Sequence, residues 1–437
     1  MNAATQVPMN RTAQVLCGAS IALIAALSPH AVAQQTTRPG LTWEQVKARF
    51  EAANPALKAD ALNVDEMHAE ETTAYLRPNP QFNFALDGTQ LLPHNGVWQP
   101  LTGEQEQSMF SYLHEREHKR ELRLETARES TRVAAEQHED LKRNLEFVLR
   151  AAYVQTIEAK AVLKLAQADI EYYDHIITIS QQRYQAGDLA QIDLDRIELQ
   201  RVQYEQELQG ALVNLRTAKI QLLQMLDDRT SVDRFDVDGP FDFSPELQQL
   251  EEMHQIALDA RPDLRAALQA EELAKSTHKL AISNGSTDPT YSIWWTHNPS
   301  FNNPNDFDTL GMSINIPLRV FDRNQGEKQR TLIDIDRSQQ TTAATRAQVF
   351  SDVDTAYAMV ASNVELLKPY KAKYLDQATR VRDTVTYAYQ HGGASLMDFL
   401  NAQSDYRTVQ LAYLQLIGTY LTATAQLNLA VGREVIP

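Results

Sequence analysis

Cysteine is almost absent from this sequence. Cys17 is the one cysteine among 437 residues, and it lies near the N-terminus. A disulfide framework and a thiolate zinc site both need several cysteines. The sequence therefore excludes a disulfide-stapled fold and a cysteine-based metal centre.

Long apolar runs are missing after the first 33 residues. A membrane-spanning helix needs about 18 or more consecutive apolar residues, and no later segment has them. Residues 1–33 carry one charge, Arg11, then an apolar run and the A-x-A sequence Ala31-Val32-Ala33. This pattern predicts a cleaved secretory signal peptide, whose loss removes Cys17 and any acyl anchor. We expect an exported protein that is periplasmic, secreted or part of a β-barrel.

Basic residues are outnumbered. The chain has 41 Lys and Arg against 57 Asp and Glu, which gives a formal charge of −16. Nucleic-acid phosphates and anionic lipid headgroups both attract Lys and Arg. The charge therefore argues against nucleic acid as a partner and against docking on an anionic membrane surface.

Glycine and proline are missing from several very long stretches. Neither occurs in residues 104–186, 327–368 or 394–417, which are rich in Ala, Leu, Gln, Glu and Arg. Such segments favour uninterrupted helices. A helix of ~65 residues would be roughly 100 Å long, so we expect long antiparallel coiled-coil helices in a mainly α protein.

Four short segments have a period of two and predict strands. Phe82, Phe84 and Leu86 alternate with smaller or polar residues, residues 291–295 form a less polar run, and residues 108–113 give the weakest pattern. In a membrane barrel the apolar face of such a strand meets lipid, whereas in a soluble protein it covers a core. Alternation alone leaves both possibilities open. The candidate lipid-facing strand contains Leu310, Met312, Ile314, Ile316 and Leu318.

The chain also repeats itself. Tyr184-Gln-Ala-Gly187 recurs 205 residues later as Tyr389-Gln-His-Gly392, and Asp193 matches Asp398 at the same offset. Each half reads as helix, strand, strand, long helix, turn, helix. We therefore predict a signal peptide in residues 1–33, a first repeat in 34–227, a linker in 228–245 and a second repeat in 246–437.

This combination resembles the TolC-like outer-membrane efflux factors. The likeness rests on the signal peptide, the duplicated order of elements and a Tyr-x-x-Gly turn in each half. The segment from Ile316 to Glu327, IPLRVFDRNQGE, is similar to the strand-to-helix segment of CzcC-like members, which serve heavy-metal exporters. The resemblance implies a homotrimer with a 12-stranded outer-membrane β-barrel, four strands from each chain, and a periplasmic α-barrel.

The resemblance also implies partners and site residues. Its partners would be a periplasmic adaptor (membrane fusion) protein, an inner-membrane RND-type pump and outer-membrane lipid. The candidate adaptor-contacting residues lie in the two tip turns: Tyr184, Gly187, Tyr389, Gly392 and Ser395. The candidate pore constriction comprises Asp398, Asn401 and Asp193, although Ser395-x-x-Asp398 also fits a helix capping box.

One enzyme motif needs separate treatment. The segment from His114 to His118 fits H-E-x-x-H, the helical signature of zinc proteases. Both intervening positions are charged, Lys119 and Arg120 follow, and no third ligand is evident. We interpret the segment as a charged transition from strand to helix and keep His114 and His118 as weak metal candidates only.

The sequence therefore predicts an outer-membrane channel subunit, a passive export conduit for heavy-metal cations, with no cofactor and no catalytic residues. A drug or small-molecule efflux channel is the alternative cargo class. A periplasmic coiled-coil structural or adaptor protein is the alternative architecture, and the four strands argue against it.

Overall fold

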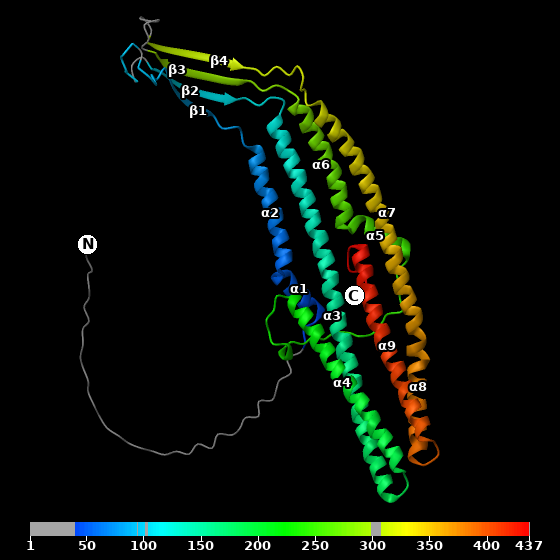
Figure 1. Cartoon of the computed structure of the whole chain (residues 1–437). Helices are drawn as coiled ribbons and strands as arrows, with labels where there is room; N and C mark the ends of the chain where they lie inside the picture. The colour runs from blue at the N-terminus through cyan, green and yellow to red at the C-terminus, as the bar shows by residue number, and fades with distance from the viewer. Residues whose placement is uncertain (1–39, 94, 101–103, 299–306, 437) are drawn as a thin grey trace, which may run out of the picture. The chain divides into compact units, whose positions relative to one another are not determined.

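The structure is a computed structural model that describes residues 40–93, 95–100, 104–298 and 307–436. The predicted signal peptide, residues 1–33, lies outside the described residues. The described chain is mainly helical, with one antiparallel four-stranded sheet, as predicted (Figure 1). Within the described ranges, no helix is both long and apolar enough to cross a membrane.

Each half begins with two short helices rather than the single one predicted. The break in each half lies at an X-Pro bond, since the residue before proline avoids the helical conformation and proline itself favours the first helical position. Asn54 precedes Pro55, and its side chain accepts hydrogen bonds from the N–H groups of Ala56 and Leu57. The four helices are α1 (Trp43–Ala53), α2 (Pro55–Tyr75), α5 (Leu250–Ala260) and α6 (Pro262–Asn284).

The sheet joins the two halves of the chain. Its strands lie in the order β1-β2-β3-β4, and β2 of the first half pairs with β3 of the second. One row of opposed residues across the sheet is Phe82, Phe110, Ile293 and Met312, all with exposed side chains. The strands are β1 (Gln81–Asp87), β2 (Gln105–Leu113), β3 (Thr290–His297) and β4 (Asp308–Asn315).

The predicted apolar strand is shorter than expected. Leu310, Met312 and Ile314 lie on one exposed face of β4. The strand ends at Asn315, so Ile316 and Leu318 are exposed but lie beyond the ladder, and the prediction was wrong for these two. Pro317 explains the end because it has no N–H to donate to a neighbouring strand.

The opposite face of the sheet is mostly polar, with Met109 and Trp294 as its large apolar side chains. Trp294 on β3 lies directly opposite Gly311 on β4. A Cβ atom at position 311 would come within 2.3 Å of the Trp294 ring. Glycine at this position therefore lets the indole lie flat against the sheet.

Two long helical hairpins follow the strands. α3 runs without a break for 68 residues, roughly 100 Å at 1.5 Å per residue. The corresponding helix of the second half is interrupted by Pro369 and a π-helical turn, Tyr370–Tyr374. The order of strand pair, long helix, turn and helix thus occurs twice, whereas the repeat boundaries themselves remain a prediction. The helices are α3 (Lys119–Ala186), α4 (Gln191–Met225), α7 (Gln325–Pro369), α8 (Leu375–Gln390) and α9 (Leu396–Val431).

α3 is the helix on which the others pack. It contacts α2, α4, α6 and α9, so it binds elements of both halves (Figure 1). Leu149, Tyr153 and Ile157 of α3 are buried in a cluster with α1, α4 and the segment after α4. Val154 is buried in a second cluster with α5, α6, α7 and α9. A third cluster lies towards the helix turns and includes Tyr173, Tyr389 and Phe399.

A buried arginine ties three of these helices together. Arg261, just before α6, is only 4% exposed. Its guanidinium donates to Asp263 at 2.6 Å, to Asp352 on α7 at 2.8 Å and to the Ala430 carbonyl on α9 at 3.2 Å. Burial would raise the pKa of Asp263, but the hydrogen bonds from Arg261 hold that pKa below its usual value.

Arg261→Met should destabilise the fold by about 3 kcal/mol, because it leaves Asp352 without its cation and Asp263 with the more distant Arg143 alone. Thermal unfolding of the purified protein at neutral pH measures the change as a lowered Tm. Arg265→Met, in the first turn of α6, is the matched control, since Arg265 is more exposed than Arg261 and its ion pair with Glu136 contributes less. Equal Tm losses in the two variants would contradict the assignment.

Candidate functional site

The first tip turn joins α3 to α4. Gly187 ends α3 with a φ of 84°, in the left-handed region that favours glycine. Its N–H donates to the carbonyls of Arg183 and Tyr184. The predicted role of Gly187 as the turn-forming residue therefore has a clear conformational basis, while its contact with an adaptor stays a prediction.

The second tip turn joins α8 to α9 and has a different helix start. Gly392 has a φ of 76°. Ser395 then caps α9: its side chain accepts from the Asp398 N–H, and Asp398 accepts from the Ser395 N–H at 3.1 Å. The capping box predicted from Ser395-x-x-Asp398 is confirmed.

The three candidate constriction residues lie at the starts of the helices after the turns. Asp398 and Asn401 are exposed, and the hydrogen bonds from Ser395 lower the pKa of Asp398. Asp193 is half-buried and pairs with Arg196 at 3.7 Å. Ala190 precedes α4 and has no side-chain oxygen, so Asp193 has no capping partner like Ser395.

The two turn tyrosines are not equivalent. Tyr389 is 5% exposed and stacks on Phe399 with ring centroids 4.9 Å apart, which agrees with a packing role. Tyr184 is 42% exposed and is not packed in the same way. Arg183 of the first hairpin donates to the Tyr389 carbonyl at 3.0 Å and lies over its ring. The structure thus brings the two hairpin ends into contact.

Sequence reasoning missed a charged cluster between the hairpins. Arg407 on α9 pairs with Asp169 on α3 at 3.4 Å and with Glu207 on α4, and it lies over the Tyr204 ring. Burial raises the pKa of Asp169 to about 6, although Arg407 opposes this. Burial also raises the pKa of Tyr204 to about 12. No local pattern in the sequence marks this cluster, because its members come from three helices.

The H-E-x-x-H segment does not form a zinc-protease helix. Glu117 and His118 both have positive φ values, and α3 begins only at Lys119. The two histidines therefore do not share one helical face. Glu115 is the residue that would act as the general base in a zinc protease. Arg123 donates two hydrogen bonds to its carboxylate. Among the described residues, no group of three His, Cys, Asp or Glu side chains could hold a metal ion.

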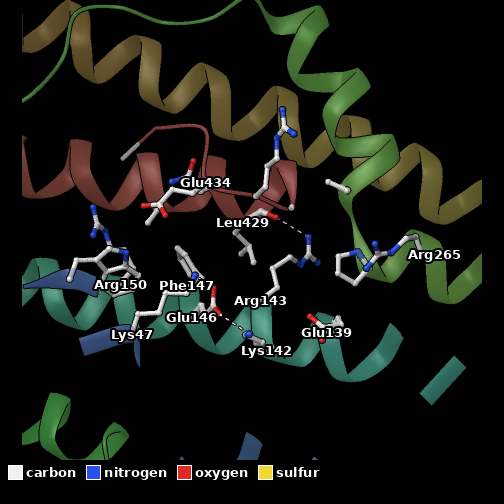
Figure 2. Close-up of a pocket in the computed structure, with 17 residues that line it drawn as sticks. Lys47, Glu139, Lys142, Arg143, Glu146, Phe147, Arg150, Arg265, Leu429 and Glu434 are labelled. Carbon is white, nitrogen blue, oxygen red and sulfur yellow. Dashed lines mark hydrogen bonds and ion pairs between the residues drawn. The ribbon is translucent and has the colours of Figure 1, made fainter. Parts of the chain in front are cut away.

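A hollow of about 350 Å³ lies between α1, α3, the start of α6 and the end of α9 (Figure 2). Six of its lining residues are Lys or Arg and three are Glu. Glu146 pairs with Lys47 at 3.0 Å, and Arg143 donates to the Leu429 carbonyl at 2.8 Å. Arg150 lies 4.6 Å from the Trp43 ring, and burial lowers its pKa. Most of the charges here serve to hold the four elements together.

A second hollow, a groove of about 800 Å³, follows a different face of α3 between α4 and α9. Amide side chains from α3 and α4 line it, and Glu158 is the one charged residue in its lining. We call this surface the α3 groove; its lining comprises Asn54, Leu145, Val148, Ala151, Ala152, Gln155, Glu158, Gln221, Gln224, Met225 and Thr422.

Comparison with known proteins agrees with this geometry. Residues 253–433 match the family model of the outer membrane efflux protein. The chain is 23% identical to the cobalt-zinc-cadmium resistance protein CzcC of Cupriavidus metallidurans over 401 residues. The aligned region covers 90% of each protein.

Solved structures show the same fold. The outer-membrane protein VceC of Vibrio cholerae superposes with a TM-score of 0.71 at 15% identity, over 90% of this chain and 97% of that one. CusC, from a study of transmembrane channel formation, gives a TM-score of 0.73 at 17% identity, over 90% and 92%. OprN, an outer-membrane channel, gives 0.72 at 14% identity, over 89% of each chain.

Removing both histidines of the H-E-x-x-H segment should have little effect. His114→Ala with His118→Ala should leave zinc content and Tm unchanged, because no third ligand joins the two histidines among the described residues. Metal analysis of the purified protein, with unfolding as the second readout, checks this. Zinc bound one-to-one in the wild type and lost in the double variant would reverse the interpretation.

Proposed function

We propose that the chain is an outer membrane efflux protein, the family whose model matches residues 253–433, and that it forms a homotrimeric channel for heavy-metal cations. The observation that carries the proposal is the four-stranded sheet at one end of very long helices, with an apolar face exposed. Leu310, Met312 and Ile314 on β4 and Phe82 and Phe84 on β1 have exposed side chains. That face is suited to lipid rather than to water.

Association would satisfy the edges of the sheet. β1 and β4 each pair with one strand only among the described residues, so each leaves a row of unpaired backbone groups. Lipid offers no hydrogen bonds to such groups, so an open edge is not tolerated there. Pairing β4 of one subunit with β1 of the next, three times over, closes a ring of 12 strands and removes both edges.

The proposed partners come from the likeness to the outer membrane efflux proteins. The sheet would lie in the outer membrane, and the helices would extend into the periplasm as a tunnel. The tip turns at Gly187 and Gly392 would meet a periplasmic adaptor protein, which connects the channel to an inner-membrane pump. In this arrangement the channel is a passive conduit, and the energy for transport comes from the pump.

The cargo is the finer part of the proposal. Heavy-metal cations are favoured because the relative CzcC is a cobalt-zinc-cadmium resistance protein. The excess of acidic residues in this chain and the exposed Asp398 beside one tip turn suit a cationic cargo. Drug or small-molecule efflux is the alternative, since the fold is shared with OprN and VceC, whose names specify no metal.

Deletion of the gene should lower the host's tolerance of cobalt, zinc or cadmium salts, and the protein should extract from outer membranes as a trimer. Growth inhibition and native mass measurement in detergent test the two parts separately. A monodisperse monomer that is soluble without detergent would rule out the channel. A trimer whose loss affects antibiotic tolerance alone would instead support the drug-efflux alternative.

Asp398→Asn should lower the cation preference of the reconstituted channel by about twofold at low salt, where screening is weak. Three copies of Asp398 around one axis would attract cations, and the amide removes that charge. The Tm should hardly change, because the asparagine oxygen can still accept the Ser395 N–H. The reversal potential in a salt gradient measures the preference.

Asp376→Asn on α8, an exposed position away from the turns, is the matched control for Asp398→Asn. It removes the same charge and should leave the reversal potential at the wild-type value. Identical selectivity in wild type and Asp398→Asn would show that Asp398 only caps α9.

A further inference from the structure

The α3 groove holds an acidic side chain that has no partner. Glu158 forms no ion pair within the described residues, and burial is the single cause of its raised pKa. The other side chains that line the groove are amides, a hydroxyl and apolar groups. A half-buried carboxylate with no cation beside it is costly, because burial disfavours the charged form.

The neighbouring helix leaves room for this carboxylate. Gly418 on α9 faces Glu158, and a Cβ atom at position 418 would come within 2.0 Å of the Glu158 Oε2 atom. Any residue other than glycine would displace the carboxylate. The missing side chain of Gly418 thus leaves space between α3 and α9, and the Glu158 carboxylate fills this space without an ion-pair partner among the described residues.

Gln155 and Glu158 lie on the face of α3 turned away from its contact with α1, while Asn54 at the end of α1 also lines the groove. Tyr153 marks the covered face, where α1 and the segment after α4 pack. At 100° per residue, Gln155 lies 200° from Tyr153 around the helix, and Glu158 lies 140° from it. In a wall one helix thick, elements packed on the inner side would obstruct the conduit. In the trimer proposed above, this face of α3 would border the tunnel.

We propose that Glu158, with the Gln155 and Gln221 amides that line the same groove, is a binding site for divalent metal cations in the tunnel, away from the tip turns. The inference rests on the trimeric channel proposed above, which would place three such carboxylates around one axis. Carboxylate and amide oxygens replace the water of a hydrated cation without holding it rigidly. The cation in turn supplies the positive charge that the buried carboxylate lacks.

The chemistry of the site suits passage rather than storage. Tight transition-metal sites use several His or Cys ligands in a closed arrangement, and the groove lining contains neither residue. Conduction requires a site that is favourable enough to enter and weak enough to leave. One carboxylate per subunit with flexible amides around it meets both requirements.

The test measures block of the reconstituted trimer by CoCl₂ in planar bilayers at low ionic strength. Glu158→Gln should raise the half-blocking Co²⁺ concentration about threefold or more, because each subunit loses a charge at the tunnel wall. Glu158→Asp keeps the charge and should stay close to wild type. Glu139→Gln is the matched control, since it removes the same charge from α3 at the other hollow (Figure 2).

Gln155→Leu gives a second route should Glu158→Gln fail to assemble, and it should shift block in the same direction by a smaller factor. Equal block in wild type and Glu158→Gln, or an equal shift in Glu139→Gln, would overturn the cation site while leaving the channel intact. A wild-type protein that forms no conducting trimer would instead overturn the channel, and the cation site with it.

Discussion

The four-stranded sheet depends on a contact that one chain cannot make. Each of its outer strands has an unpaired edge among the described residues, and one face carries exposed aromatic and aliphatic side chains. The sheet is also the seam between the halves, because β2 pairs with β3 from the other half of the chain. A neighbour that satisfied the edges would therefore also fix how the two halves of each chain stand beside each other.

The contact between the two halves of the chain continues along the helices, away from the sheet. α3 begins where β2 ends and packs on α6 and α9 of the other half, so the contact between halves continues along its length. At the far end Arg183 donates to the Tyr389 carbonyl and joins the two turns. Between these ends the Arg407 cluster adds a charged contact among α3, α4 and α9. The two halves are thus held at the sheet, along α3 and at the turns.

Local chemistry made much of this predictable. Long stretches without glycine or proline predicted the helices, alternation predicted the strands, and Ser395-x-x-Asp398 predicted the cap that the structure contains. The errors also have local causes: Pro55 and Pro262 each divide a helix that was expected to be single, and Pro317 ends β4 early. The Arg407 cluster and the Glu158–Gly418 contact could not be predicted, because each joins helices that are far apart in the sequence.

The charged residues of the hollow beside α1 differ from Asp398 and Glu158 in whether they have a partner of opposite charge. The hollow beside α1 collects lysines and arginines that mostly pair with nearby carboxylates and carbonyls, so its charge is used in holding helices together. Within the described part of the chain, neither Asp398 nor Glu158 has such a cation: Asp398 is exposed beside a tip turn, and Glu158 lines the α3 groove. A path that carries cations gains from carboxylates that stay unpaired, since an internal lysine or arginine would neutralise them. In the channel proposed above, these two acids would remain available to a passing ion, while most of the arginines beside α1 pack the helices together.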